Sequence, residues 1–313
     1  MALKNLTKIE SSMSKSTTRH KTVLLNESIE NLNLKPGKIY FDGTLGGAGH
    51  TMKVYSDFKG KVRIIATDRD NLAIRNAEER LSQCECKHDL VLSNYKDIDV
   101  VLAKLGVEKV DAILLDLGLS SDQLDVSGRG FSFRNDEPLH MTFAENTKNI
   151  ITAETILNNW KEETIADIIF AYADERYSRR IAKAIVEARE STPIKTTYQL
   201  VEIIRLAVPA SYRNGKINCA TKTFQALRIA VNDEITALKE GMEKGWKVLN
   251  EGGRMAIISF HSVEDREVKN YFRNKSKEGA GKLINKKPIT PTDEEIKENP
   301  RSRSAKLRVI EKI

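Results

Sequence analysis

The sequence predicts a doubly wound, Rossmann-like α/β fold with a helical insertion. Apolar, β-branched runs alternate with helical patterns over residues 39–119, which is typical of parallel βαβ units. Over residues 133–214 these runs disappear, and apolar residues recur at helical spacing instead. A strand-like run then returns near the C-terminal end, so the sheet is expected to resume after the insertion.

This pattern divides the chain. A long amphipathic helix is expected over 223–249, followed by strands over 254–260 and 305–311. The first residues are rich in Ser, Thr and Lys, which indicates a disordered tail; an organellar transit peptide is the alternative, although Glu10 argues against it. The expected parts are a tail (1–19), a catalytic domain (20–132 and 215–313) and a helical insertion that helps to bind substrate (133–214).

A glycine-rich segment marks the expected ligand site. A short strand at Ile39–Phe41 leads into Asp42-Gly-Thr-Leu-Gly-Gly-Ala-Gly-His-Thr51, and a helix is expected over 52–58. Glycine lets the backbone approach a ligand closely, and the following helix start offers free N–H groups. Alone, this pattern indicates only a nucleotide-like ligand.

Polar residues at the ends of the following strands make the site more specific. Asp68 ends an apolar run about twenty residues after the glycines, where a carboxylate can accept ribose hydroxyls. Tyr95 follows the next strand and can lie against an adenine, and Asp116 ends a buried-type strand. Because ligands of open α/β sheets bind outside the carboxyl ends of the strands, these residues are expected to converge.

Two cofactor classes use this layout. A dinucleotide site favours G-x-G-x-x-G, but here Asp42 begins the loop and the glycines are spaced differently. Asp42 would repel a pyrophosphate and tolerate the positive charge of S-adenosylmethionine, which we therefore favour. In the alternative interpretation, Asp42 only braces the turn or caps the helix.

Long ordered motifs then identify a resemblance that covers the chain from about His20 to its last residues. The motifs are HKTVLL (20–25), DGTLGGAGH (42–50), DLGLSS (116–121) with QLD (123–125), RGFSF (129–133), ERYSRRIA (175–182), TKTFQALRI (221–229), SFHSVEDR (259–266) and NPRSRS (299–304). In these motifs the chain resembles the ribosomal RNA small subunit methyltransferase H (RsmH/MraW) family. It departs from the family's usual residues at His140, where an acid is common, and around Asn218.

The resemblance implies a class I S-adenosylmethionine-dependent methyltransferase. In this family the substrate is the exocyclic N4 amine of a decoding-centre (P-site) cytosine in 16S rRNA. The family's cofactor contacts fall on seven positions of this sequence: Ala48, Gly49, His50, Asp68, Tyr95, Asp116 and Gln123. The implied partner is 16S rRNA in the small ribosomal subunit, in the cytoplasm, and a homodimer is one expected assembly.

Asp116 is the candidate catalytic residue. The lone pair of a cytosine amine is delocalised into the ring, so an acceptor aimed at its N–H would assist attack and later proton removal. Asp116 can serve as that acceptor; the alternative is that it only contacts the cofactor. Ring-carbon methylation would need a nucleophilic cysteine, and none of Cys84, Cys86 and Cys219 is expected at a strand end.

Substrate contacts are expected from His261, directly after a strand, and from Arg129 and Arg179 in or beside the insertion. A histidine at such a position is also a common structural hydrogen-bonding residue. Basic residues gather in two regions, 129–180 and 286–308, where they can form phosphate-binding surfaces or simply solvated faces.

The composition limits the kinds of partner and site that this chain can have. The chain has 313 residues, 40% hydrophobic, with a net charge of +7, which favours a polyanionic partner. Three cysteines form no paired metal motif, so no metal is expected, and no apolar stretch reaches membrane length. Two other functions stay open: methylation of another nucleic-acid amine, and a non-catalytic RNA-binding assembly factor.

Overall fold

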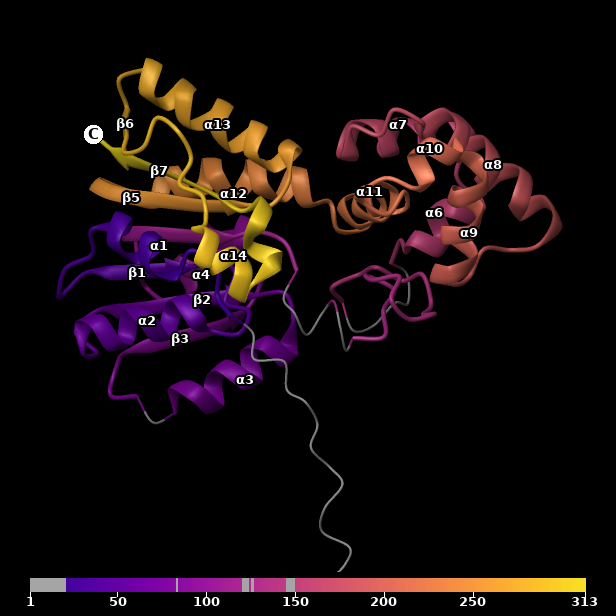
Figure 1. Ribbon diagram of the computed structural model, residues 1–313. Coiled ribbons are helices and arrows are strands. Elements are labelled where there is room, and N and C mark those ends of the chain that lie inside the picture. The colour runs from indigo at the N-terminus through magenta and orange to yellow at the C-terminus, as the bar shows by residue number, and fades with distance from the viewer. Residues whose placement is uncertain (1–20, 83, 120–123, 125–126, 145–149) are drawn as a thin grey trace, which may run out of the picture.

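The computed structural model describes residues 21–313 except 83, 120–123, 125–126 and 145–149. The expected tail, 1–19, therefore lies outside the described residues. A sheet covered by helices forms one part of the molecule, and a separate group of helices lies beside it (Figure 1).

The sheet has seven strands in the order β3-β2-β1-β4-β5-β7-β6. The first five in that order run parallel, whereas β7 is antiparallel to both of its neighbours. This confirms the predicted α/β fold class and the late return to the sheet. The strands are β1 (Ile39–Asp42), β2 (Arg63–Asp68), β3 (His88–Leu92), β4 (Val110–Asp116), β5 (Leu249–Ser259), β6 (Gly281–Leu283) and β7 (Lys306–Lys312).

Helices bury both faces of the sheet. Alternate strand residues point to opposite faces, so Tyr40 packs in one core and its neighbour Phe41 in the other. One core lies under α1 (Leu25–Leu32), α2 (Gly49–Phe58) and α3 (Asn71–Leu81). The other lies under α4 (Ile98–Lys104), α12 (Glu234–Val248) and α13 (Ser262–Lys277).

The strand order reverses between β1 and β4. Successive strands wind outward from β1 to β2 and β3, and then the chain returns to place β4 on the other side of β1. At such a point the connections diverge and leave a crevice beyond the carboxyl ends of the strands. Two short elements follow near the C-terminus: α14 (Asp293–Glu298), which lies beside the sheet in Figure 1, and the 3₁₀ turn η2 (Pro300–Ser304).

A third hydrophobic core belongs to the helical group, and its residues run from Phe131 to Leu227. This extends past residue 214, where the insertion was expected to end. The group comprises α6 (Ala153–Asn159), α7 (Glu162–Ala173), α8 (Ser178–Ser191), α9 (Thr197–Ala207), α10 (Ala210–Arg213) and α11 (Thr221–Asn232).

The single long helix expected over 223–249 is wrong. Asp233 adopts φ 49°, a left-handed conformation that ends α11 and starts α12. The apolar residues keep helical spacing across this break, and therefore periodicity alone does not reveal it. The two halves serve different cores: Leu227 packs in the helical group, whereas Leu238 packs against the sheet.

Asn232, the last residue of α11, joins the helical group to the loop after Leu139. Its Nδ2 donates to the Met141 carbonyl oxygen at 2.7 Å, and its Oδ1 accepts the Phe143 N–H at 3.0 Å. Asn232 is only 4% exposed, so water cannot replace these bonds.

We expect Asn232→Ala to lower the free energy of unfolding by about 2 kcal/mol, because it leaves a buried donor and acceptor without partners. Urea denaturation would measure the change. Asn274→Ala, at an exposed position of α13, is the matched control and should change stability by less than about 0.5 kcal/mol. Equal changes in the two variants would contradict the proposed role of Asn232.

Candidate functional site

A cavity opens at the predicted edge of the sheet. Its wall includes the glycine loop after β1, the residues that end β2 and β4, the first turns of α12 and α13, and the segment around η2. The C-terminal segment is brought there by β7, which doubles back beside β5 (Figure 1).

The glycine loop is fixed by hydrogen bonds to neighbouring strand ends. The Gly46 N–H donates to Asp68 Oδ2 at 2.8 Å, and Thr44 Oγ1 accepts the Asp116 N–H at 2.6 Å. Gly43 has no room for a side chain: a Cβ there would lie 2.3 Å from a methyl carbon of Leu115. The loop is therefore held against β2 and β4.

Asp42 stabilises this loop from its buried side, away from the cavity. Its carboxylate accepts the Thr51 hydroxyl at 2.8 Å, the Tyr40 hydroxyl at 3.3 Å and the Thr44 N–H at 3.2 Å. Burial raises the pKa of Asp42 to about 6, although these three bonds oppose the rise. The structure supports the bracing interpretation, because Asp42 is 1% exposed and does not line the cavity.

Asp116 faces the cavity from the end of β4. Burial raises its pKa well above the usual range, and the nearby carboxyl groups of Asp42 and Glu264 add to that rise. Its Oδ2 lies 3.8 Å from His50 Nδ1, while its buried Oδ1 makes no hydrogen bond within the described part of the chain. A buried acceptor aimed at a cavity is suited to a ligand's N–H or positive charge.

Tyr95 lies at the cavity in the 3₁₀ turn η1 (Tyr95–Asp97). Its side chain is packed between Gly43 and Gly241: a Cβ at Gly241 would lie 2.6 Å from its ring. Burial raises the pKa of its hydroxyl, and Glu234 and Glu264 add to this. Gly241 thus lets α12 approach Tyr95 closely.

Five of the seven expected cofactor residues line the cavity: Gly49, His50, Asp68, Tyr95 and Asp116. Ala48 lies behind it, fully buried, and takes a left-handed conformation (φ 58°) just before α2. Gln123 lies outside the described residues. Their roles as cofactor contacts stay a prediction.

The two arginines expected to bind substrate occupy different settings. Arg129 donates to the Phe143 carbonyl oxygen at 2.9 Å and pairs with Asp70 at 3.2 Å, so it ties the loop after β4 to the start of α3. Arg179 lies exposed on α8 and does not line the cavity. Substrate binding by these two arginines therefore stays a prediction.

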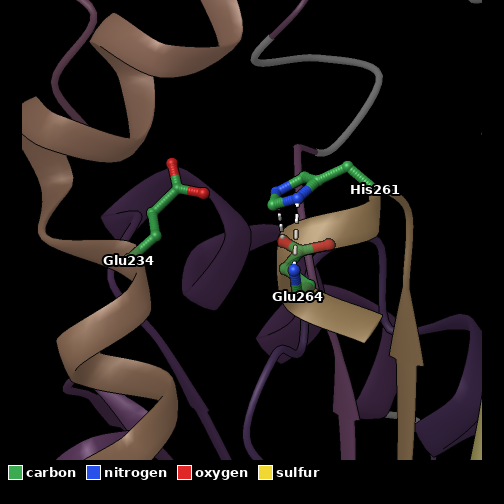
Figure 2. A group of neighbouring side chains, drawn as sticks. All are labelled: Glu234, His261 and Glu264. Atoms are coloured by element: carbon green, nitrogen blue, oxygen red, sulfur yellow. Dashed lines mark hydrogen bonds and ion pairs between the residues drawn. The ribbon is translucent and has the colours of Figure 1, made fainter. Parts of the chain in front are cut away.

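His261 lies at the turn between β5 and α13, where it caps the helix. Its Nδ1 accepts the Glu264 N–H at 3.3 Å, and its Nε2 lies 3.1 Å from the Glu264 carboxylate (Figure 2). Burial opposes ionisation of Glu264, but His261, Arg228 and the Phe260 N–H together lower its pKa. Both ring nitrogens face Glu264, which favours the structural role for His261.

Glu234 completes a group whose ligand atoms lie within 4.8 Å of one another, and its carboxylate points toward His261 and Glu264 (Figure 2). Such a group can hold a metal ion in principle. Arg228, however, forms two 2.8 Å hydrogen bonds to Glu234 and thereby neutralises it. We interpret the group as an ion-pair network between α11, α12 and α13.

Sequence reasoning missed several cavity residues: Thr44, Glu234, Glu264 and Asn299. Thr44, Glu264 and Asn299 fall inside the motifs quoted above, and those motifs were the available signal. Glu234 had none, because its position depends on the unforeseen break at Asp233.

The cavity fits S-adenosylmethionine. Burial raises the pKa of both Asp68 and Asp116, so an added positive charge would be stabilised there. The sulfonium and amino group of this cofactor supply that charge. Asp68, at the tip of β2, has the carboxylate expected for a ribose.

Comparison with known proteins supports the assignment of S-adenosylmethionine to this cavity. Residues 17–313 match the model of the MraW methylase family. Proteins described as ribosomal RNA small subunit methyltransferase H include one from Brevibacillus brevis (44% identical; 94% of this chain, 98% of that protein) and one from Acetivibrio thermocellus (45%; 94% and 99%).

A solved structure of a Streptococcus mutans putative methyltransferase in complex with SAH is 15% identical, with a TM-score of 0.43 over 94% of this chain and 99% of that one. A structural similarity this low does not identify the family or the function of the chain. The family match and the two relatives carry the identification: the chain belongs to the MraW methylase family, and its cofactor is S-adenosylmethionine.

Proposed function

We propose that this protein transfers a methyl group from S-adenosylmethionine to the exocyclic N4 amine of a decoding-centre cytosine in 16S rRNA. The observation that carries the proposal is the carboxylate of Asp116, which faces the cavity beside the expected cofactor residues and whose buried Oδ1 makes no hydrogen bond in the described part of the chain. The relatives' names support small-subunit rRNA as the substrate.

S-adenosylmethionine supplies an electrophilic methyl group attached to a sulfonium. In our proposal the Asp116 carboxylate accepts an N–H from the amine, which localises the nitrogen lone pair and holds it in line for attack. Thr44 keeps Asp116 in place through its bond to the Asp116 N–H. Asp68 and His50 hold the cofactor.

The base itself must enter a recessed cavity. A paired base cannot present its amine there, so we expect the target cytosine to be unpaired or flipped out. The site of action would be the cytoplasm, where small subunits are assembled. No helix among the described residues has both the length and the apolarity needed to cross a membrane.

The direct test is to incubate the purified protein with labelled S-adenosylmethionine and small ribosomal subunits, and then to map methylated cytosines by mass spectrometry of rRNA fragments. N4-methylcytosine at one decoding-centre position is the expected result. Label on another nucleic acid would replace the substrate, and cofactor binding without any transfer would favour a non-catalytic assembly factor.

A further inference from the structure

A second cavity lies between α13 and the segment that joins β6 to β7, on the sheet's outer edge. Phe272, Leu283 and Pro288 contribute its apolar wall. Its charged residues are all basic: Lys269, Arg273, Lys286, Lys287 and Arg308. No acidic residue is among the described residues that line it.

Most of this charge is not neutralised by the protein. Arg308 pairs with Asp265 at 2.7 Å, and Lys306 also uses that carboxylate, at 3.2 Å. Within the described part of the chain, the other four cations have no carboxylate within 4.0 Å. Like charges around one cavity repel each other, and an anion would relieve that repulsion.

The loop that carries Lys286 and Lys287 has a fixed backbone. Asn285 donates to the carbonyl oxygens of Lys287 at 2.8 Å and Leu307 at 3.0 Å, and it accepts the Val309 N–H at 2.8 Å. Ile289 also pairs with Leu307. The two lysines are therefore presented from a braced loop rather than from a solvated tail.

This second cavity lies close enough to the methyl-transfer site for one RNA strand to reach both. Glu264, in the first turn of α13, lines that site, and Lys269 and Arg273 follow on the same helix. At 1.5 Å per residue they lie about 8 and 14 Å farther along the helix axis. An RNA strand with one base in the active site can reach this far within a few nucleotides.

We propose that this basic cavity binds a backbone phosphate of the substrate RNA and so helps to place the target base. The inference rests on the proposed function, because it takes the RNA substrate from there. Lysine and arginine are the residues that bind phosphate groups, and such contacts position a nucleic acid without reading its sequence.

The test compares two double variants with equal reductions in charge. Lys286→Gln/Lys287→Gln removes the loop cations, whereas Lys104→Gln/Lys109→Gln removes two exposed lysines near the amino end of β4. Affinity for small-subunit rRNA is measured over a salt series. The loop variant should lower the slope of log K against log salt by about 0.7 to 0.9 for each phosphate that the protein no longer binds, and the control should not.

Methyl-transfer kinetics give a second readout. The loop variant should raise KM for the RNA by about tenfold while kcat is retained, and Lys269→Gln/Arg273→Gln should act in the same direction. Equal slopes in the loop and control variants would overturn the inference even if the wild type methylates rRNA. A wild type that binds RNA but transfers no methyl group would instead contradict the proposed function, and the slopes would still test the cavity.

Discussion

Replacing Asp116 by asparagine should reduce kcat for methyl transfer by about 100-fold or more, which is the range for loss of a positioned proton acceptor. The substitution keeps the shape of the side chain and its backbone bond to Thr44, but it removes the negative charge. Because the negative charge of Asp116 also stabilises the positively charged cofactor, the Kd for S-adenosylmethionine should rise, and kcat is therefore measured at saturating cofactor. If Asp116 acts on the amine, kcat falls even at saturation, whereas kcat is retained at saturation if Asp116 only braces the cofactor.

The matched control is Asp111→Asn, at the opposite end of the same strand. Asp111 accepts the Ile39 N–H at 2.9 Å and pairs with Lys38, away from the cavity. This variant should keep its kcat. Undiminished methylation by Asp116→Asn, with normal cofactor affinity, would eliminate the catalytic role.

The ionisation of Asp116 should also make the rate of methyl transfer fall at low pH, which appears as an acidic limb in the pH–rate profile. Burial, Asp42 and Glu264 raise the pKa of Asp116 well above the usual range, so the free enzyme holds it protonated over a wider pH interval. Only the ionised form can accept the amine proton, and activity should therefore rise with pH. Because a bound cation lowers a carboxyl pKa, the limb in kcat should lie at lower pH than the limb in kcat/KM.

The strand ends of this fold were predictable because their signals are local. An apolar run that stops at an acid predicts both a strand and where it ends, and Asp68 and Asp116 lie where that rule places them. Parallel strands then bring those ends to one edge of the sheet, so the cofactor cavity follows from the sequence without knowledge of the packing.

The break at Asp233 was not predictable in this way. Apolar spacing continues across it, and the left-handed residue is an aspartate rather than the glycine that usually marks a helix end. The break decides which core each half joins and brings Glu234 to the cavity. The partners of His261 were hidden for a related reason, since a cap depends on atomic geometry that spacing does not show.

The protonation of Asp42 should make the free energy of unfolding depend on pH. The pKa of Asp42 rises from 3.8 to about 6 in the folded protein, mainly because it is buried. A raised pKa means that the folded state binds the proton more tightly than the unfolded chain. The stability that this proton provides is complete below pH 3.8 and is lost as the pH rises through about 6.

Asp42→Asn should remove this cost of ionisation. Its amide can still accept the Thr44 N–H and can donate to the Thr51 hydroxyl, so the loop keeps its brace. Relative to the wild type, the variant should gain about 2 kcal/mol in free energy of unfolding between pH 4 and pH 8. Denaturant melts at both pH values would measure this gain, with the exposed Asp57→Asn as the control.

The same substitution distinguishes an electrostatic role of Asp42 at the active site from a purely structural one. The charge of Asp42 is one cause of the raised pKa of Asp116, so its removal should let Asp116 ionise at lower pH. The acidic limb of methyl transfer in Asp42→Asn should then move to lower pH than in the wild type. A gain in stability without that movement would contradict the predicted chain from Asp42 through Asp116 to the limb: either the two carboxyl groups are not coupled, or a group other than Asp116 sets the limb.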